Sequence, residues 1–211
     1  MTSLNLFILT GLWLSYFFIH SLLASLSVKN WFKFKYPTAA HGYRLLYNFF
    51  AIVLLFPLIF YIYFVPSQVI IEWSGTTEIT ANIIALAGFA GFLYSLKFYA
   101  GMEFLGLSQY KAKKTDEAGS FVISPLHRYV RHPWYLFALM IIWTRDMNAH
   151  FLLSACLMTA YFYIGSYFEE QKLIVHFGER FKQYTKKVPR IIPSPRRFLT
   201  SSQASKLTRE D

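Results

Sequence analysis

Charged residues and cysteines are scarce in this chain of 211 residues. Only 15% of the residues are charged, whereas 55% are hydrophobic and 20% are aromatic. Soluble domains carry about 25% charged residues and disordered chains are poor in hydrophobic ones, so both classes are excluded for most of the sequence. The single cysteine, Cys156, excludes a disulfide scaffold, and nothing marks a metal centre. No G-x-G-x-x-G or phosphate-binding-loop motif is present, so a soluble nucleotide-binding fold is unsupported.

The hydrophobic residues gather in runs long enough to cross a membrane. A helix needs about 20 mainly apolar residues to span the bilayer. Three runs reach that length, and they are residues 4–24, 43–65 and 79–101. A hairpin follows, with a short arm at 134–144, a polar turn at 145–148 and a return arm at 151–168. We therefore expect an all-α, multi-pass integral membrane protein with about five transmembrane helices.

Basic residues outnumber acidic ones, 21 Lys and Arg to 11 Asp and Glu. They are concentrated in alternate loops between the predicted spans, that is, on one side of the membrane. The loops after the first and third spans and the tail from Glu169 are rich in Lys and Arg, whereas the loop after the second span has none. Lys and Arg concentrate in cytoplasmic loops. We therefore expect the N-terminus outside and the C-terminus in the cytoplasm, with membrane lipids and not nucleic acid as a partner.

We expect one membrane domain over residues 1–199. It divides into an N-terminal part with three spans, 1–104, and a hairpin with a cytoplasmic tail, 105–199. The polar residues 200–211 are expected to form a flexible tail. The third span also carries the small residues Ala87, Gly88 and Gly91. Small residues let helices approach closely, so this span should pack tightly against another helix.

Arg131 and His132 lie just before the short arm of the hairpin. A span of about 20 residues counted back from Asp146 reaches Leu126, which puts both side chains at the depth of the inner acyl chains. An unpaired charge there is strongly unfavourable, so both should face a pocket within the protein. Pro133 suits the first turn of the helix that follows. Alternatively, Arg131 simply marks the membrane boundary.

The acids Glu169 and Glu170 end the last predicted span. Adjacent positions on a helix differ by about 100°, so the two carboxylates cannot face one ligand. A polar stripe recurs at helical spacing along one face of this span, and it comprises Thr159, Tyr163, Ser166 and Glu170. We therefore expect Glu170 to face the interior of the protein; the alternative is a solvated helix end.

Basic and apolar residues are interspersed from Leu173 to Lys187. Such a segment is typical of a helix that lies on the anionic inner surface of a membrane. It overlaps the pattern Phe-Gly-x-x-Phe-x-x-Tyr, which begins at Phe177, and is followed by Val-Pro-Arg-Ile-Ile-Pro, which ends at Pro193. Composition alone leaves open whether this segment is more than a surface anchor.

Three motifs follow one another in the C-terminal half: Arg131-His132-Pro133-x-Tyr135, Glu169-Glu170-x-x-Leu173 and Phe177-Gly178-x-x-Phe181-x-x-Tyr184-x-x-x-Val188-Pro189-x-x-x-Pro193. Together they resemble the integral-membrane methyltransferases, which include isoprenylcysteine carboxyl methyltransferase, phospholipid N-methyltransferases and methanethiol S-methyltransferase. The resemblance covers about residues 106–193. It implies S-adenosylmethionine bound on the cytoplasmic side, between the hairpin and the tail. The cofactor-binding residues that it implies are Tyr129, Arg131, His132, Pro133, Tyr135, Glu169 and Glu170.

The choice of methyl acceptor rests on where the chain departs from that family. The carboxyl-methylating branch has an Arg four residues before the second Glu, where this chain has Ser166. A carboxylate acceptor would lack its natural partner there. His20-Ser21 and Arg44-x-x-Tyr47-Asn48 resemble the thiol methyltransferase group. We therefore expect methyl transfer to a small thiol or a lipid-like acceptor, with His127 or Tyr129 taking the thiol proton.

Three other functions stay open at this point. They are an isoprenylcysteine-type carboxyl methyltransferase, a sterol-reductase-like membrane enzyme that uses NADPH, and a non-catalytic membrane protein that keeps the pocket as a relic. Sterol reductases carry more spans, for which 211 residues leave little room. Binding of S-adenosylmethionine, of NADPH or of neither distinguishes these functions.

Overall fold

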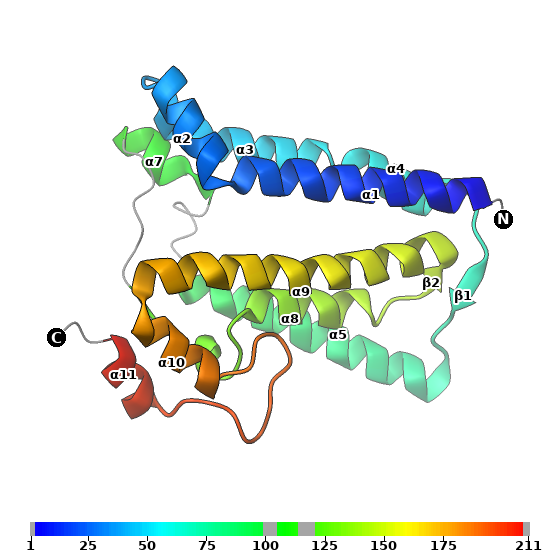
Figure 1. The fold of residues 1–211 in the computed structure, drawn as a ribbon. Coiled ribbons are helices and arrows are strands. Elements are labelled where there is room, and N and C mark those ends of the chain that lie inside the picture. The colour runs from blue at the N-terminus through cyan, green and yellow to red at the C-terminus, as the bar shows by residue number, and fades with distance from the viewer. Residues whose placement is uncertain (1–2, 99–104, 114–120, 209–211) are drawn as a thin grey trace. The chain divides into compact units, whose positions relative to one another are not determined.

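The computed structural model describes residues 3–98, 105–113 and 121–208, and it is almost entirely helical (Figure 1). The chain begins with α1 (Ser3–Ala24), α2 (Leu26–Lys35), η1 (Ala40–Gly42), α3 (Tyr43–Val53), α4 (Phe56–Phe64) and β1 (Val69–Ile71). It continues with α5 (Gly75–Ser95), η2 (Leu96–Phe98), α7 (Leu107–Ala112), η3 (Leu126–Arg128) and α8 (Pro133–Ile142). It ends with β2 (Met147–Asn148), α9 (Ala149–Phe177), α10 (Glu179–Lys187) and α11 (Ser201–Thr208). The expected all-α class is confirmed.

Four helical segments of the described chain are long and apolar enough to cross a membrane: Ser3–Ala24, Ala40–Phe64, Gly75–Phe98 and Ala149–Phe177. They correspond to four of the predicted spans, and the protein is a multi-pass integral membrane protein. The remaining predicted span, the short arm at 134–144, corresponds to α8, which has only 10 residues and a length of about 15 Å. The count of about five spans is therefore not confirmed, because α8 is too short to cross a bilayer by itself. The orientation stays a prediction.

The second of these segments is interrupted near its middle. α3 ends at Val53 and α4 begins at Phe56, and a turn at Leu54 and Leu55 joins them. Pro57 lies in the first turn of α4, where its missing N–H removes no helical hydrogen bond. The proline therefore divides one predicted span into two helices, and its position explains where the division falls.

Contacts divide the chain into two compact units, each of which we consider by itself. The first unit consists of Met1–Glu72, Tyr99–Ala118 and Asp146–Leu157. The second consists of Trp73–Phe98, Gly119–Arg145 and Met158–Asp211. The start of α9 thus belongs to the first unit and its longer remainder to the second. This division differs from the expected one at residue 104, because α5 packs against α8 and so joins the later part of the chain.

In the first unit, α1 packs against α2, α3 and α4. Its buried apolar side chains include Leu9, Trp13, Leu58 and Ile62. The indole N–H of Trp13 donates to Ser154 Oγ over 2.8 Å, which joins α1 to the start of α9. β1 and β2 pair antiparallel over two residue pairs, a short contact that the hydrophobic pattern did not predict.

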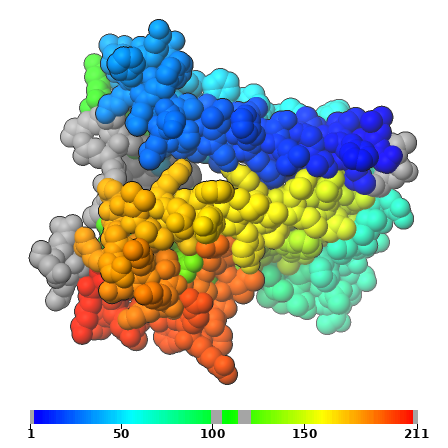
Figure 2. Space-filling model, in the orientation of Figure 1, coloured from blue at the N-terminus to red at the C-terminus, as the bar shows by residue number. Residues whose placement is uncertain are grey.

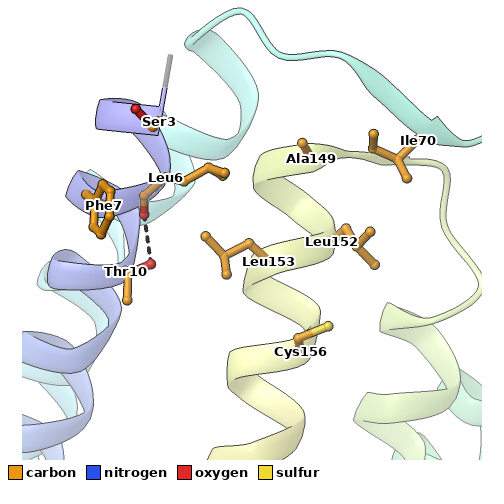
Figure 3. Close-up of a pocket in the computed structure, with 9 residues that line it drawn as sticks. All are labelled: Ser3, Leu6, Phe7, Thr10, Ile70, Ala149, Leu152, Leu153 and Cys156. Atoms are coloured by element: carbon orange, nitrogen blue, oxygen red, sulfur yellow. Dashed lines mark hydrogen bonds between the residues drawn. The ribbon is translucent and has the colours of Figure 1, made fainter. Parts of the chain in front are cut away.

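A cavity of about 420 Å³ opens in the first unit near the starts of α1 and α9 (Figure 3). Leu6, Leu152 and Leu153 line it together with Cys156, whose side chain is exposed. The hydroxyl of Thr10 donates to the carbonyl of Leu6, which leaves an essentially apolar wall. None of the predicted site residues lines this cavity. The candidate site must therefore lie elsewhere in the fold.

In the second unit, α5 and α8 approach each other closely. A Cβ placed on Gly91 would lie 2.6 Å from Cε1 of Phe137, and one placed on Gly88 would lie 3.0 Å from the carbonyl oxygen of Phe137. Real Cβ atoms do not approach a neighbour as closely as the first of these distances, so a larger residue would push the helices apart. The prediction that small residues on the third span mark a tight helix contact is confirmed.

The chain reverses between α9 and α10 at Gly178, whose φ of 61° suits a residue without a side chain. After this turn, Phe181 and Tyr184 of α10 pack in a buried cluster with Leu199 and with Ala204 of α11. Residues 201–208 therefore form a helix where a flexible tail is expected from the sequence. The contacts of α10 and α11 explain the difference, because a mainly polar segment becomes ordered once its few apolar side chains find partners. The final three residues lie outside the described part of the chain.

The sequence predicts one surface helix from Leu173 to Lys187, and the structure corrects this interpretation. The segment is divided at Gly178 between the end of α9 and α10. The apolar face of α10, formed by Phe181 and Tyr184, is buried within the second unit. This face is therefore occupied by the protein and cannot be the part that contacts a membrane.

Candidate active site

Arg131 and His132 lie between η3 and α8, and Pro133 is the first residue of α8. The backbone N–H of Arg131 donates to the carbonyl of Pro189 and that of His132 to the carbonyl of Arg190, both over 2.9 Å. His132 is the N-cap residue of α8 and Pro133 its first residue, as predicted. These bonds hold two distant motifs side by side, since the chain between them includes α8, α9 and α10.

Glu170 faces the interior, and Glu169 does not. The side chain of Glu170 is 4% exposed, whereas that of Glu169 is 51% exposed. The polar stripe continues inward through Ser166, which is fully buried and donates its hydroxyl to the carbonyl of Tyr163. The expectation that Glu170 is the inward acid is confirmed, because a rotation of about 100° separates adjacent helical side chains.

Three cationic or potentially cationic side chains surround the Glu170 carboxylate. Arg131 makes a bidentate contact, with Nε to Oε1 at 2.8 Å and Nη2 to Oε2 at 3.0 Å. Arg190 donates through Nε and Nη2 to Oε2 at 3.2 and 3.1 Å. His132 Nε2 lies 3.0 Å from Oε1. Bidentate arginine–carboxylate contacts are among the strongest charge-assisted hydrogen bonds, so this cluster fixes all four side chains.

These contacts leave the Glu170 carboxylate little capacity for a ligand. A carboxylate offers about four lone-pair positions. Its two oxygens here receive two bonds from Arg131, two from Arg190 and one contact from His132. Arg131 is fixed further, because its Nη1 donates to the backbone carbonyls of Thr185 and Val188. Glu170 therefore orients the cations around it.

Glu169 lies at the open side of this cluster. Its Oε2 accepts a long hydrogen bond of 3.4 Å from the hydroxyl of Tyr135 and lies 3.6 Å from His132 Nδ1. The rings of His132, Tyr135 and Phe162 stack almost in parallel, with centroid separations of 5.3 and 4.8 Å. The result is a carboxylate that is accessible to solvent beside a wall of flat rings.

His127 is held in place by two contacts outside the Glu170 cluster. Its Nδ1 lies 2.7 Å from Ser124 Oγ, and its carbonyl accepts a hydrogen bond of 2.6 Å from the hydroxyl of Tyr184. Burial, together with a smaller contribution from the nearby charge of His132, lowers the pKa of His127 from 6.5 to about 4. His127 is therefore neutral near pH 7.

Tyr129 takes part in a different group of contacts. Its ring stacks on Phe198 at a centroid distance of 6.0 Å, and the guanidinium of Arg128 lies 5.7 Å from the ring centroid. The side chain is 49% exposed. The structure thus brings together Arg131, His132, Tyr135, Glu169 and Glu170 with Pro133 beside them. Tyr129 instead contacts Phe198 and Arg128.

Arg190 is the main residue of this cluster that the sequence did not single out. It lies within the Val-Pro-Arg segment of the third motif, 20 residues after the acid that it contacts. A buried acid requires compensating charge, so the surplus of Lys and Arg in the tail was a signal that one of them returns to Glu170. Nothing in the spacing selected Arg190. Phe162 was missed for the same reason, since it does not belong to a periodic pattern with Tyr135, on which it stacks.

No family model matches the chain, and no solved structure matches it. Curated relatives do match part of it. Methanethiol S-methyltransferase of Pseudomonas deceptionensis is 41% identical over 87 residues, which is 41% of this chain and 32% of the relative. Methanethiol S-methyltransferase 1 of Bradyrhizobium diazoefficiens is 31% identical over 119 residues, 54% of this chain and 42% of the relative. The protein of that name from Mycobacterium tuberculosis is 33% identical over 115 residues, 52% of this chain and 47% of the relative.

The chain thus spans between about a third and a half of the length of these relatives. All three carry one printed name, that of an S-methyltransferase that acts on a thiol. Together with the membrane helices and the clustered motifs, this similarity confirms the resemblance of the chain to the integral-membrane methyltransferases.

Proposed function

We propose that the protein is an integral-membrane methyltransferase that moves a methyl group from S-adenosylmethionine to a small thiol. The observation that carries the proposal is the Glu170 cluster, in which Arg131, His132 and Arg190 from two motifs meet one buried acid. Burying this many charged groups is costly, and a solvated helix end would not require it. A binding site for a charged ligand does require such a cluster, because the ligand must meet oriented charges that are shielded from water.

The residues at the open side of the cluster fit the amino-acid end of S-adenosylmethionine, which carries one carboxylate and one ammonium. Glu169, at 51% exposure, has the charge for the ammonium. Arg190, at 31% exposure, has the charge for the carboxylate. Tyr135 and its ring stack offer a flat apolar surface beside them. When bound, the cofactor supplies a methyl group on a sulfonium; the protein supplies position and a dry surrounding.

Glu170 has a positioning role in this proposal. Its oxygens are occupied by Arg131, Arg190 and His132, so it acts on a ligand through them. This differs from a direct contact between Glu170 and the cofactor, which the motifs alone suggest. Pro133 contributes by starting α8 directly after His132, which fixes the direction of that ring.

A thiol must lose its proton before its sulfur attacks a methyl group. His127 and Tyr129 are our two candidates to receive it. His127 is neutral at pH 7 and is therefore able to accept a proton, although a pKa of about 4 makes it a weak base. Single-turnover assays of His127→Ala and Tyr129→Phe decide between them. The rate of methyl transfer should fall in only one of the two variants, and this fall should diminish at high pH, where the thiol loses its proton to solvent.

The acceptor is assigned to the thiol class by two independent features. The relatives carry the printed name methanethiol S-methyltransferase. Ser166 stands where the carboxyl-methylating branch has an Arg, and its buried hydroxyl is turned to the backbone of its own helix. A prenylcysteine carboxylate would therefore find no cation at this position. A lipid-like acceptor without a charge remains compatible with the same features.

The cofactor proposal is tested by titrating labelled S-adenosylmethionine onto the detergent-purified protein and its variants. Glu169→Gln should weaken binding by about 10- to 150-fold, the equivalent of one charge-assisted contact, without lowering thermal stability. Glu170→Gln should weaken binding and also lower stability, because it loosens the arginines. NADPH binding instead would point to a reductase, and binding of neither to a non-catalytic protein. Unchanged affinity in both variants would contradict the site.

The acceptor proposal is tested with a panel of methyl acceptors and labelled cofactor. Methanethiol and other small thiols should be methylated, whereas a prenylcysteine acid should not. Turnover of the prenylcysteine acid without turnover of any thiol would reverse the assignment and leave the cofactor site intact.

The orientation is a separate proposal. The distribution of Lys and Arg favours an external N-terminus and a cytoplasmic C-terminus, which would put the Glu170 cluster on the cytoplasmic side. A reporter fused after Asp211 should be active only if it functions in the cytoplasm. Activity of a periplasmic or lumenal reporter there would overturn the orientation.

A further inference from the structure

The second unit carries a strongly basic surface beyond the Glu170 cluster. From Arg180 to Thr208 the chain has eight Lys and Arg residues and no Asp or Glu. Arg190 is committed to Glu170, but Lys186, Lys187 and Arg196 are exposed. Exposed charge of one sign over so short a stretch attracts a partner of opposite charge.

Part of this basic surface is held in place by hydrogen bonds to the backbone. Arg197 donates through Nη2 to the carbonyls of Thr185 and Lys186, both at 3.1 Å. These carbonyls belong to the last turn of α10, whose negative dipole end favours a cation. The bonds hold the segment after α10 against that helix end, so Arg196 and Arg197 lie close to Lys186 and Lys187.

Apolar side chains are interleaved with these cations. In residues 188–200, which we call the C-terminal segment, Ile191 and Leu199 are 1% and 0% exposed, whereas their neighbours Ile192 and Phe198 are 64% and 45% exposed. The inward pair anchors the segment in the second unit. The outward pair presents two large apolar side chains on the same stretch as the cations. Figure 2 draws this part of the chain in orange to red.

The position of this surface along the chain decides which partner fits. α10 begins at Glu179, directly after the turn at Gly178 that ends α9, and α9 is a membrane-spanning segment. A surface so close to the end of a span lies near lipid headgroups. A soluble anion or a nucleic acid explains the cations but not the exposed Ile192 and Phe198, whereas a bilayer interface accepts both kinds of side chain.

We propose that the C-terminal segment, together with the end of α10, binds anionic phospholipid headgroups and inserts Ile192 and Phe198 into the bilayer interface. Lys186, Lys187, Arg196 and Arg197 supply the charge. The proposal replaces the apolar face of α10, which is buried, with the C-terminal segment as the part that contacts the membrane. It does not depend on the proposed methyltransferase activity.

The test uses the full chain in nanodiscs of phosphatidylcholine with phosphatidylglycerol. Cys156, the only cysteine, is replaced by Ala, and a fluorescent label is attached to Ile192→Cys or, as a position control, to Gln183→Cys on the exposed face of α10. Brominated phosphatidylglycerol or brominated phosphatidylcholine is added in equal amounts. The label at position 192 should be quenched by both lipids and more by phosphatidylglycerol, and this preference should disappear at high salt.

Charge variants sharpen the test. Each cation removed near an anionic surface should reduce the preference for phosphatidylglycerol over phosphatidylcholine by about fivefold. Lys187→Gln and Arg196→Gln should therefore each lower this preference. Lys182→Gln is the matched control, because Lys182 is already paired with Glu179 at 3.5 Å. Circular dichroism confirms that each variant is folded.

Three outcomes would overturn the proposal. One is equal quenching by the two brominated lipids at low salt, which would mean that the surface does not select anionic headgroups. Another is quenching of the label at position 192 by aqueous iodide as strong as that at position 183, which would mean that the segment lies in water. A wild-type protein that retains phosphatidylglycerol no better than phosphatidylcholine during delipidation would contradict it without any variant.

Discussion

The two compact units bury polar groups in different ways. In the first unit, the indole of Trp13 donates to Ser154 and the hydroxyl of Tyr47 lies 2.6 Å from His20 Nε2, which are contacts that need no full charge. In the second unit, Glu170 is buried among two arginines and a histidine. A neutral buried hydrogen bond contributes about 0.5–1.5 kcal/mol, whereas removing one partner of a buried charge cluster costs about 3–5 kcal/mol.

This difference is the reason for proposing the active site in the second unit. Neutral contacts at a helix interface are sufficient to hold spans together. A charged cluster is a weak source of stability, because desolvation offsets most of its attraction. Its presence in the second unit therefore supports the proposed ligand site. Four experiments test the contrast between the two units.

The largest effect is expected from Glu170→Ala. This change leaves Arg131, with 8% exposure, buried without its carboxylate and frees Arg190 as well. We expect a loss of about 3–5 kcal/mol in the free energy of unfolding, measured by denaturation in detergent. Glu169→Ala is the control, with a loss of about 1 kcal/mol or less, since its side chain is half exposed. Equal losses would mean that the cluster does not organise the second unit.

The next effect is steric. Gly91→Ala places a Cβ 2.6 Å from the ring of Phe137 at the contact of α5 with α8, and should lower the free energy of unfolding by about 1–3 kcal/mol. Gly11→Ala in α1 of the first unit meets nothing within 4 Å and should instead stabilise the helix by about 0.5–1 kcal/mol. Thermal unfolding of both variants measures the contrast, and a stabilised Gly91→Ala protein would refute the tight contact.

A smaller loss is expected in the first unit. Ser154→Ala leaves the indole N–H of the buried Trp13 without its acceptor and should cost about 1–2 kcal/mol. Adding Trp13→Phe removes the unsatisfied donor, so the double variant should lose less than the sum of the single variants. A double-mutant cycle in unfolding assays measures this coupling. Additive losses would show that the hydrogen bond contributes nothing.

The smallest effect depends on pH. The folded pKa of His127, about 4, lies below its ordinary value of 6.5, so between these values the unfolded chain binds a proton that the folded chain does not. Stability should therefore fall as the pH falls, by about 0.8 kcal/mol between about pH 7.5 and about pH 6. His127→Gln should remove this part of the slope. An unchanged slope in that variant would assign the pH dependence to other groups.

Much of the fold follows from patterns that are local in the sequence. The lengths of the apolar runs predicted the four long membrane helices, because the thickness of a bilayer sets the length of a helix that crosses it. Pro133 was equally informative, since it begins α8. The break at Gly178 was not predicted, because Leu173 to Lys187 was interpreted as one helix. The 10-residue length of α8 was visible in its short arm, but was interpreted as a fifth span.

For the candidate site, the sequence predicted which face of its helix each acid occupies. The polar stripe through Ser166 identified Glu170 as inward and Glu169 as outward, because helical periodicity depends only on spacing. Which cation meets the acid was not predictable in the same way. Arg190 is 20 residues from Glu170 and Arg131 is 39 residues from it, across turns whose angles no spacing encodes.

The sequence was sufficient to predict the helical class, the four long membrane helices, the motif order and the inward face of α9, since each depends on a period or a length within one segment. Tertiary structure decided the rest. It paired the carbonyls of Pro189 and Arg190 with the Arg131-His132 backbone, buried the apolar face of α10, and gave the tail, which forms α11, a partner in α10. The physical reason is that compensation of a buried charge or apolar face requires atoms in contact, and contacts between distant segments depend on how turns and packing orient whole helices.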